Sequence, residues 1–466
     1  MAGTTGTTAR TGPTDTVAGG SPGRGGRRGL AARAAAVVLA GAGLVGALAP
    51  AAGAADAPAP YRVTASADGE PAAGSAQRVD RAALDAALRA MTGPGGSTAA
   101  LARVREGGRT AWAGAVGSAD LATGAAASAD GRFRIGSVTK TFVSTVVLQL
   151  VAEHRIGLED SVESRLPGAV PNGAGITVRQ LLNHTSGLVS YTDDAAFNFD
   201  NPAVVRQWLA GGRWTPYRPQ QLVDIATAHP PYFAPGQGWH YSNTNYILAG
   251  MLIERTTGRS WAEEVERRII RPLGLTGTSM PVHSPFIAGP HAHGYLPLDT
   301  GPADATLLDP SMAGASGAGI STTADLARFI SALLGGQLLG PAELAEMQRT
   351  ADIGDGATYG LGLQRMTTPC GEFWGHGGGI PGYTTVMLGE AGGRRQFAAS
   401  VNPYDVSDPD TANAAFNRLI LAGECGGRPP AADPAGPAGS AGLTGLTGLT
   451  GPAGLAGLAG AAGKIG

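Results

Sequence analysis

Strand-like runs stand near both ends of one long stretch of the chain, and this placement constrains the fold most. One pair of runs, within residues 98–117, flanks Gly107-Gly108, a dipeptide suited to a hairpin turn. A second pair, within residues 384–402, flanks a turn-like Ala-Gly-Gly. Between the two pairs, over about 158–330, helical patterns alternate with loops rich in Pro and Gly.

Helical spacing also occurs close to the strand-like runs, at 79–91, at 141–157 and at 408–423, where Asp408 or Asp410 is the candidate N-cap. The order of elements predicts an α/β (α+β) fold. An antiparallel sheet flanked by helices would be built from both ends of the domain, with a mostly helical lobe inserted. A cleft between two such lobes is a natural site for a small ligand.

The ends of the chain differ in composition from this stretch, and we divide the chain accordingly. Arginines lead into an apolar run of about 16 residues, 34–49, which is short for a membrane span and is followed by an Ala-Gly-Ala cleavage site. Residues 1–54 are therefore predicted to be a signal peptide, with an N-terminal membrane anchor as the alternative and the export route open. Residues 55–77 form a predicted linker, and 78–426 the domain. We expect a secreted protein with no membrane span after signal cleavage.

The C-terminal segment, 427–466, carries glycine at every third position from Gly436 onward. This is the collagen period, but only two prolines reinforce it, so we predict a disordered tail. The domain holds both cysteines, Cys370 and Cys425. In an oxidising compartment such a pair indicates one disulfide, worth roughly 4 kcal/mol in the chain-entropy model, and a metal site is the weaker alternative.

Lysine is almost absent from the chain, which has only Lys140 and Lys464 among 34 basic residues. Lys140 follows Ser137 by three positions at an apparent helix start, so the two side chains lie on one face. A serine hydroxyl is a poor nucleophile unless a neighbour takes its proton. Buried lysine can become neutral and do so, whereas arginine stays protonated. The pair predicts nucleophile and base.

Two further segments extend this pattern. Tyr241-Ser242-Asn243 precedes a helical run, and His376-Gly377-Gly378-Gly379 precedes the late strand-like runs. The tyrosine could relay the serine proton, and Asn243 could hold the lysine and a substrate amide oxygen. The glycines would let the backbone approach a substrate and offer an oxyanion N–H. Taken alone, either segment is better explained as structure, but the three in this order favour catalysis.

The stretch 78–426 resembles the penicillin-recognising serine hydrolases of the class C β-lactamase group, and most closely the secreted D-alanyl-D-alanine carboxypeptidases. The resemblance lies in FRIGSVTKTF, ITVRQLLNHTSGL, YSNTNYILAGMLIE, STTADLARFISALLGGQL, YGLGL and GHGGGIPGY, and the cysteines fall where those enzymes have a disulfide. It implies a β-lactamase/transpeptidase-like fold, no metal or cofactor, and catalytic residues Ser137 (nucleophile), Lys140 (base), Tyr241 (relay), Asn243 and His376. The amides of Ser137 and Gly379 would form the oxyanion hole.

The substrate-binding positions depart from that family pattern. Where the carboxypeptidases place an arginine after YGLGL, this chain has Gln364, with Arg365 next. Where they read HTGT, it has His376 followed by Gly377, Gly378 and Gly379. A charge-assisted bond to the substrate's terminal carboxylate, worth about 1.5–3 kcal/mol, would be weakened. We predict acylation chemistry more firmly than carboxypeptidase specificity.

The predicted function is a D-alanyl-D-alanine carboxypeptidase acting on peptidoglycan stem peptides through an acyl-serine. The alternatives are a class C-like β-lactamase, an esterase, a D-aminopeptidase, or a non-catalytic penicillin- or cell-wall-binding protein. Expected partners are a small peptide, ester or β-lactam and peptidoglycan, and we expect a monomer. A net charge of −2 argues against nucleic acid.

Two other hydrolase classes fit the sequence poorly. The α/β-hydrolase elbow G-x-S-x-G occurs only as GGSPG at 19–23, inside the predicted signal peptide. A metal hydrolase would have to use HAHG at 291–294, which lies in a Pro/Gly-rich loop and lacks the H-E-x-x-H pattern.

Overall fold

The computed structural model of the chain describes residues 79–93, 96–353, 358–404 and 408–428. The predicted signal peptide, the GGSPG segment, the linker and nearly all of the predicted tail lie outside the described residues. The predictions made for them stay predictions.

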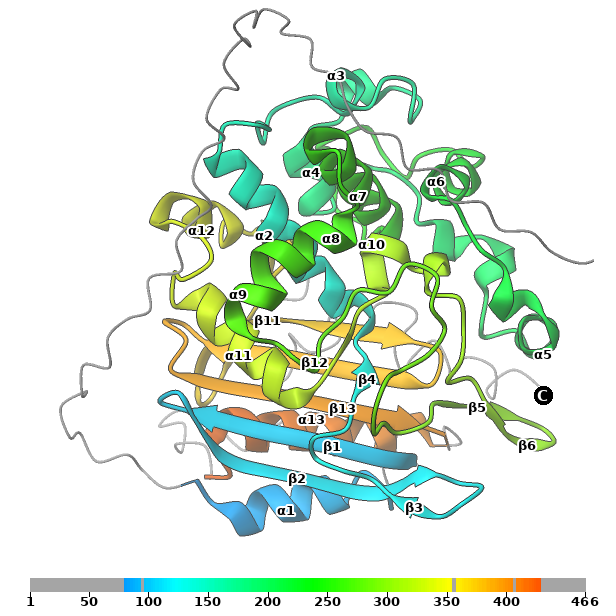
Figure 1. The fold of residues 1–466 in the computed structure, drawn as a ribbon, viewed down its shortest axis with the longest axis vertical. Helices are drawn as coiled ribbons and strands as arrows, with labels where there is room; N and C mark the ends of the chain where they lie inside the picture. Colours follow the sequence, from blue (N-terminus) through cyan, green and yellow to red (C-terminus); the bar gives the residue numbers. More distant parts are fainter. Residues whose placement is uncertain (1–78, 94–95, 354–357, 405–407, 429–466) are drawn as a thin grey trace, which may run out of the picture. The chain divides into compact units, whose positions relative to one another are not determined.

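A nine-stranded antiparallel sheet is the platform of the domain (Figure 1). Its strand order is β3-β2-β1-β13-β12-β11-β10-β9-β8. The strands are β1 (Ser97–Glu106), β2 (Arg109–Asp120), β3 (Ala125–Ala126), β8 (Ala351–Asp352), β9 (Thr358–Tyr359), β10 (Gln364–Thr368), β11 (Gly371–Ile380), β12 (Tyr383–Glu390) and β13 (Arg395–Pro403). Because β1 pairs with β13, the sheet is built from both ends of the domain, and the predicted fold class is confirmed.

One face of the sheet is covered by the first and last described helices, α1 (Arg81–Arg89) and α13 (Pro409–Cys425). Alternate residues of β1 are buried against them, since side chains of a strand point to opposite faces in turn. The Asp408 side chain caps α13 by accepting from the amide of Thr411, and Asp80 caps α1 in the same way. A disulfide joins Cys370, after β10, to Cys425 at the end of α13, with Cα atoms 5.2 Å apart. The predicted pairing is therefore present.

The other face carries the helical lobe (Figure 1). Its α-helices are α2 (Thr139–Ala152), α3 (Val162–Arg165), α4 (Val178–Leu182), α5 (Pro202–Ala210), α6 (Pro219–Thr227), α7 (Asn243–Thr257), α8 (Trp261–Val265), α9 (Arg271–Leu273), α10 (Gly314–Gly317), α11 (Thr323–Leu334) and α12 (Pro341–Met347). Short helical turns are η1 (Gly136–Val138), η2 (Gly173–Gly175), η3 (Tyr191–Asp193), η4 (Ala195–Phe197), η5 (Gly212–Trp214), η6 (Glu266–Ile270) and η7 (Pro310–Met312). Two small ribbons complete the lobe, β4 (Phe133–Arg134) with β7 (Ile320–Ser321), and β5 (Tyr295–Leu298) with β6 (Gly301–Asp304).

Helix α2 runs through the centre of this lobe. All its residues from Thr139 to Leu150 are buried, and Phe142 stacks on Phe329 of α11 with ring centroids 3.7 Å apart. The sequence predicted an apolar stripe ending at Gly157, but the helix is enclosed on all sides and ends at Ala152. Enclosure explains the difference, because a helix with no solvent face needs no polar side.

The glycine-rich segment after His376 is also placed differently from the prediction. His376 to Gly379 were expected to precede the late strands, but they belong to a strand themselves, β11. Beyond Gly375, which is opposite Gln364, β11 is no longer paired with β10. This part of β11 packs against η1, with backbone in close contact.

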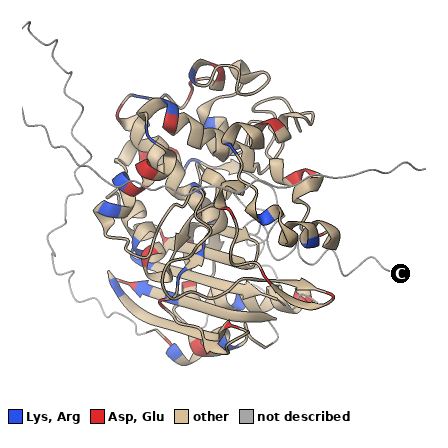
Figure 2. Ribbon diagram, turned by 45° about the vertical axis from the view of Figure 1, so that its right-hand side comes forward, with Lys and Arg blue, Asp and Glu red and all other residues tan. Residues whose placement is uncertain are grey.

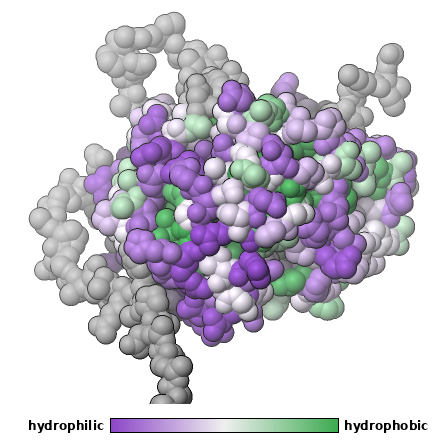
Figure 3. Space-filling view, turned by 90° about the horizontal axis from the view of Figure 1, so that it is seen from above, coloured by the Kyte–Doolittle hydropathy of each residue, from purple (hydrophilic) through white to green (hydrophobic). Residues whose placement is uncertain are grey.

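The surface mixes charge and polarity. Figure 2 shows acidic and basic residues interspersed over the ribbon, and Figure 3 shows apolar residues interleaved with hydrophilic ones. Among the described helices, none is long and apolar enough to cross a membrane. The same residues contain no group of three or more His, Cys, Asp or Glu arranged to hold a metal ion, and His293 of the HAHG segment instead pairs with Asp304.

Candidate active site

The turn η1 places Ser137 directly in front of α2 and close to the backbone of β11. A Cβ on Gly136 would lie 2.8 Å from the nitrogen of Gly379, and one on Gly378 would lie 2.0 Å from the carbonyl oxygen of Ile135. Gly136 also has φ of +48°, which disfavours other residues. Only glycine permits this approach, so the amides of Ser137 and Gly379 border the same small space.

Lys140 lies one turn after Ser137, as predicted, and its side chain is fully buried. Its Nζ lies 3.0 Å from Ser137 Oγ, 2.6 Å from Asn243 Oδ1 and 2.7 Å from the carbonyl oxygen of Ser316. The last two atoms can only accept hydrogen bonds. A neutral amine would therefore direct its two N–H groups to them and its lone pair to the Ser137 hydroxyl.

The surroundings of Lys140 favour that neutral form. Burial places the pKa of Lys140 well below its usual value. No carboxylate is within ion-pair distance of it among the described residues. Ser137, in contrast, is only partly buried and can be reached by a substrate.

Tyr241 and Asn243 enter the site from the start of α7. Burial raises the pKa of Tyr241, and a hydrogen bond with Ser137 offsets only part of that effect. Tyr241 is thus a phenol that can pass a proton on, and Lys140 Nζ lies 4.9 Å from the centre of its ring. The Asn243 amide donates to Thr192 Oγ1 at 3.0 Å, which turns its oxygen towards Lys140.

His376 is buried beside this group, with its ring centre 6.3 Å from that of Tyr241. Burial is the main cause that lowers the pKa of His376 to about 3, so the ring is neutral. Its Nε2 lies 2.9 Å from the hydroxyl of Tyr359, and its Nδ1 contacts the carbonyl oxygen of Gly377. Both ring nitrogens are engaged with these partners rather than with Ser137.

The predicted substrate residues Gln364 and Arg365 point to opposite faces of β10. Gln364 is buried on the face that Met366 presents to α1 and α13, whereas Arg365 is exposed, with its guanidinium 3.6 Å from Glu372. Gln364 lies opposite Gly375, one residue before His376. The structure thus brings Ser137, Lys140, Tyr241, Asn243 and Gly377 to Gly379 together, and it places Gln364 on the sheet face away from them.

Four participants were missing from the sequence-based site: the Ser316 carbonyl and the side chains of Thr192, His184 and Tyr359. The segments LLNHTSGL and YGLGL contain the last two, so a signal existed for them. The Ser316 carbonyl has none, since any residue supplies the same backbone atom.

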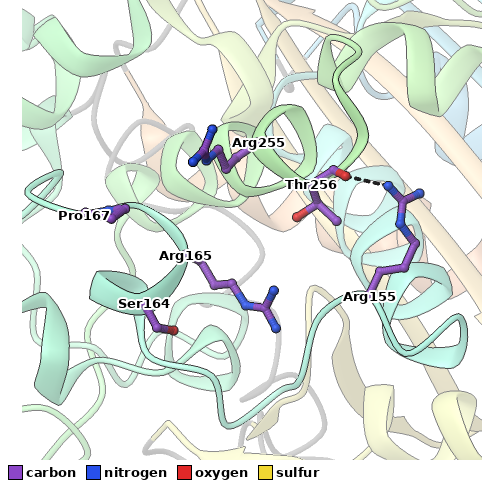
Figure 4. Close-up of a pocket in the computed structure, with 6 residues that line it drawn as sticks. All are labelled: Arg155, Ser164, Arg165, Pro167, Arg255 and Thr256. Atoms are coloured by element: carbon purple, nitrogen blue, oxygen red, sulfur yellow. Dashed lines mark hydrogen bonds between the residues drawn. The ribbon is translucent and has the colours of Figure 1, made fainter.

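Cavities elsewhere in the lobe are separate from this group. One of about 510 Å³ is lined by Arg155, Arg165 and Arg255, among others (Figure 4). Its guanidinium groups point in different directions, and Arg155 donates to the carbonyl of Thr256. Arg165 is paired with Asp160. Nothing in this cavity touches Ser137 or Lys140.

Comparison with known proteins gives one family and several relatives. The family model described as Beta-lactamase matches residues 84–419. Penicillin-binding protein 4* of Bacillus subtilis is 30% identical over 336 residues, which cover 68% of this chain and 71% of that protein. Among solved structures, a D-stereospecific amidohydrolase from Streptomyces sp. has a TM-score of 0.65 and 42% identity, covering 72% of this chain and 98% of that one. A D-amino acid amidase from Ochrobactrum anthropi SV3 has a TM-score of 0.62 and 28% identity, covering 73% and 98%.

Proposed function

Because the chain belongs to the β-lactamase family of serine hydrolases, we propose that it hydrolyses amide bonds next to D-configured residues through an acyl-Ser137 intermediate. The observation that carries this proposal is the buried Lys140, whose amine has two acceptor-only partners and faces the Ser137 hydroxyl. A buried lysine without a carboxylate is suited to be a base rather than a structural cation.

The reaction follows from the arrangement of these groups. Lys140 takes the proton of Ser137 as Oγ bonds to the substrate carbonyl carbon. The carbonyl oxygen becomes an oxyanion that accepts from the amides of Ser137 and Gly379. Tyr241 gives its proton to the leaving amine and regains one from Lys140, so the amine departs neutral. Water then attacks the acyl carbon, gives one proton to Lys140, and releases the acid as that proton returns to Ser137.

Charged residues that neighbour the site residues in sequence support a substrate with a free amine. Thr192, which holds Asn243, is followed by Asp193, an exposed carboxylate that accepts from the Tyr232 hydroxyl. Arg365 is paired with Glu372. It is the arginine closest in sequence to the position where carboxypeptidases bind a carboxylate. We therefore place D-aminopeptidase or D-amino-acid amidase activity first. Two structural relatives are named for such activities.

The second candidate is the D-alanyl-D-alanine carboxypeptidase predicted from the sequence. The free edge of β11 beyond Gly375 favours it, because an extended peptide can pair with such an edge. The similarity to a penicillin-binding protein also supports it.

A comparison of three substrates separates these candidates. D-alaninamide carries a free amine, N-acetyl-D-alaninamide has it blocked, and N-acetyl-D-alanyl-D-alanine carries a free carboxylate. We expect the first to be hydrolysed at least about tenfold faster than either blocked compound, the effect of losing one charged hydrogen bond. Fastest release of alanine from the dipeptide would instead establish the carboxypeptidase. Ser137→Ala is the control, and equal rates for D- and L-alaninamide would contradict the D-specific proposal.

We also propose that the protein is exported and acts on peptidoglycan-derived material as a monomer. The disulfide Cys370–Cys425 supports an oxidising compartment. N-terminal sequencing of the protein from the culture medium tests export, and a mature N-terminus close to residue 55 is the expected result. Protein found only inside the cells, with residues 1–54 still attached, would contradict it.

A further inference from the structure

We propose that His184 and Tyr359 are positioning residues for this reaction. With His376 they form a one-directional chain of hydrogen bonds that ties the backbone amide of Ser242 to the backbone carbonyl of Gly377. The proposal rests on the proposed acyl-transfer function.

The first half of the chain fixes the state of His184. Its Nδ1 lies 3.1 Å from the amide nitrogen of Ser242 and 3.2 Å from Nδ2 of Asn245, whose oxygen accepts from Ser186. Both neighbours of Nδ1 are donors, so this nitrogen carries no proton. The ring is fully buried and neutral, hence the proton is on Nε2, which lies 3.3 Å from the hydroxyl of Tyr359. Burial lowers the pKa of His184 and maintains the neutral state.

The second half fixes the state of His376. Its Nδ1 contacts the carbonyl oxygen of Gly377, which can only accept, so the proton of this neutral ring is on Nδ1. Its Nε2 is then an acceptor, 2.9 Å from the Tyr359 hydroxyl. Tyr359 then receives from His184 and donates to His376, and its hydroxyl also has the Tyr246 side chain as a partner. Every bond of the chain therefore points the same way.

The chain joins the two parts of the site that must act on one substrate. Ser242 lies between Tyr241, the relay, and Asn243, the partner of Lys140. Gly377 begins the run that ends with the oxyanion amide of Gly379. The chain of hydrogen bonds thus sets the spacing between the start of α7 and β11. Misplacement of catalytic groups by about 1 Å can lower a rate a hundredfold.

The backbone of His184 supports a positioning role. Its φ is +64°, a conformation that residues other than glycine adopt rarely and only where neighbours hold them. The groups around its ring are aromatic, basic or amide: Tyr241, Tyr246, Tyr359, Trp239, Lys140, His240, His376 and Asn245. No carboxylate contacts this ring among the described residues, so protonation would leave a second N–H directed at the Ser242 amide.

Nitrogen NMR of the wild-type protein tests the chain of hydrogen bonds without any assay of activity. The protein has eight histidines, which can be labelled selectively with ¹⁵N. The variants His184→Gln and His376→Gln assign the two signals. We expect His184 as the Nε2–H tautomer and His376 as the Nδ1–H tautomer, both unchanged between pH 6 and 8. The opposite tautomer, or an average of two, at either residue would overturn the proposal.

Kinetics tests the positioning role. Tyr359→Phe removes the middle hydroxyl, and Tyr383→Phe is the matched control, since Tyr383 is a buried tyrosine of β12 that donates to the carbonyl of Ala292. With a short chromogenic ester, we expect Tyr359→Phe to lower kcat at least about tenfold with KM changed less than about threefold. The control should lose similar thermal stability and keep its kcat.

Equal kcat values for these two variants would overturn the positioning role. If Tyr359→Phe does not fold, His376→Gln replaces it, because glutamine retains an acceptor near Nε2 but not the donor to Gly377. We expect His376→Gln to lower kcat as well. A kcat equal to that of the wild-type protein would count against the proposal. Failure of the wild-type protein to turn over the ester or to acylate Ser137 would instead refute the proposed function, and the tautomers would still decide whether the chain exists.

Discussion

The close approach of β11 to η1 makes Gly378→Ala the most informative single substitution. The added Cβ would lie 2.0 Å from the carbonyl oxygen of Ile135, whereas real Cβ contacts below 3.0 Å essentially do not occur. The strand must therefore withdraw by about 1 Å, and it takes the amide of Gly379 with it. Loss of one oxyanion donor lowers rates by about 10²–10³, or roughly 2.7–4 kcal/mol in the transition state. We expect a decrease of that size in the acylation rate.

The assay is the rate constant for acyl-Ser137 formation, followed by mass spectrometry under single-turnover conditions. Gly389→Ala, on β12, is the control, because its Cβ would lie 2.7 Å from a Leu334 methyl group of α11. Overpacking should cost Gly378→Ala about 1–3 kcal/mol of stability, and Gly389→Ala less, since the Leu334 side chain can move. Only Gly378→Ala should lose acylation. A rate within about threefold of wild type in a folded Gly378→Ala protein would refute the assignment of the oxyanion hole.

Three further predictions concern charge and stability. Lys140→Arg should abolish acylation, because arginine stays protonated and cannot act as a base. Mass analysis of Ser137 measures this, and a normal rate would exclude Lys140 as the base. Burial raises the pKa of Glu424 from 4.5 to about 8. Between these pH values the folded state holds a proton that the unfolded chain releases. The contribution of Glu424 to stability is therefore fully present below pH 4.5 and is lost as the pH rises through 8. Urea denaturation should show a loss of up to about 4 kcal/mol between pH 5 and 9, absent in Glu424→Gln; a flat wild-type profile would contradict it. Replacing Cys370 and Cys425 by alanine should lower the unfolding free energy by roughly 2–4 kcal/mol, and unchanged stability would show that the bond contributes nothing.

Local sequence patterns were sufficient for the sheet and for the first half of the site. The hairpin around Gly107-Gly108 and the cap at Asp408 depend on turn and capping chemistry within a few residues, and both are present. Ser137 and Lys140 are one helical turn apart, as their spacing requires.

Long-range packing determined what the sequence did not indicate. Three successive glycines have low strand propensity, yet Gly377 to Gly379 lie in β11 because only glycine fits beside η1. Gln364 and Arg365 were each predicted to bind substrate, but as neighbours in a strand they point to opposite faces. The Ser316 carbonyl reaches Lys140 through the fold alone, since a backbone oxygen has no sequence signature.

Incubation of the purified protein with a labelled penicillin, followed by intact-mass and peptide analysis, tests the central claim most directly. The claim is that Ser137, activated by a neutral Lys140, forms an acyl-enzyme. It predicts one covalent adduct per chain, on Ser137, that is absent in Ser137→Ala. A folded protein that acquires no adduct, or that carries it on another residue, would contradict the account.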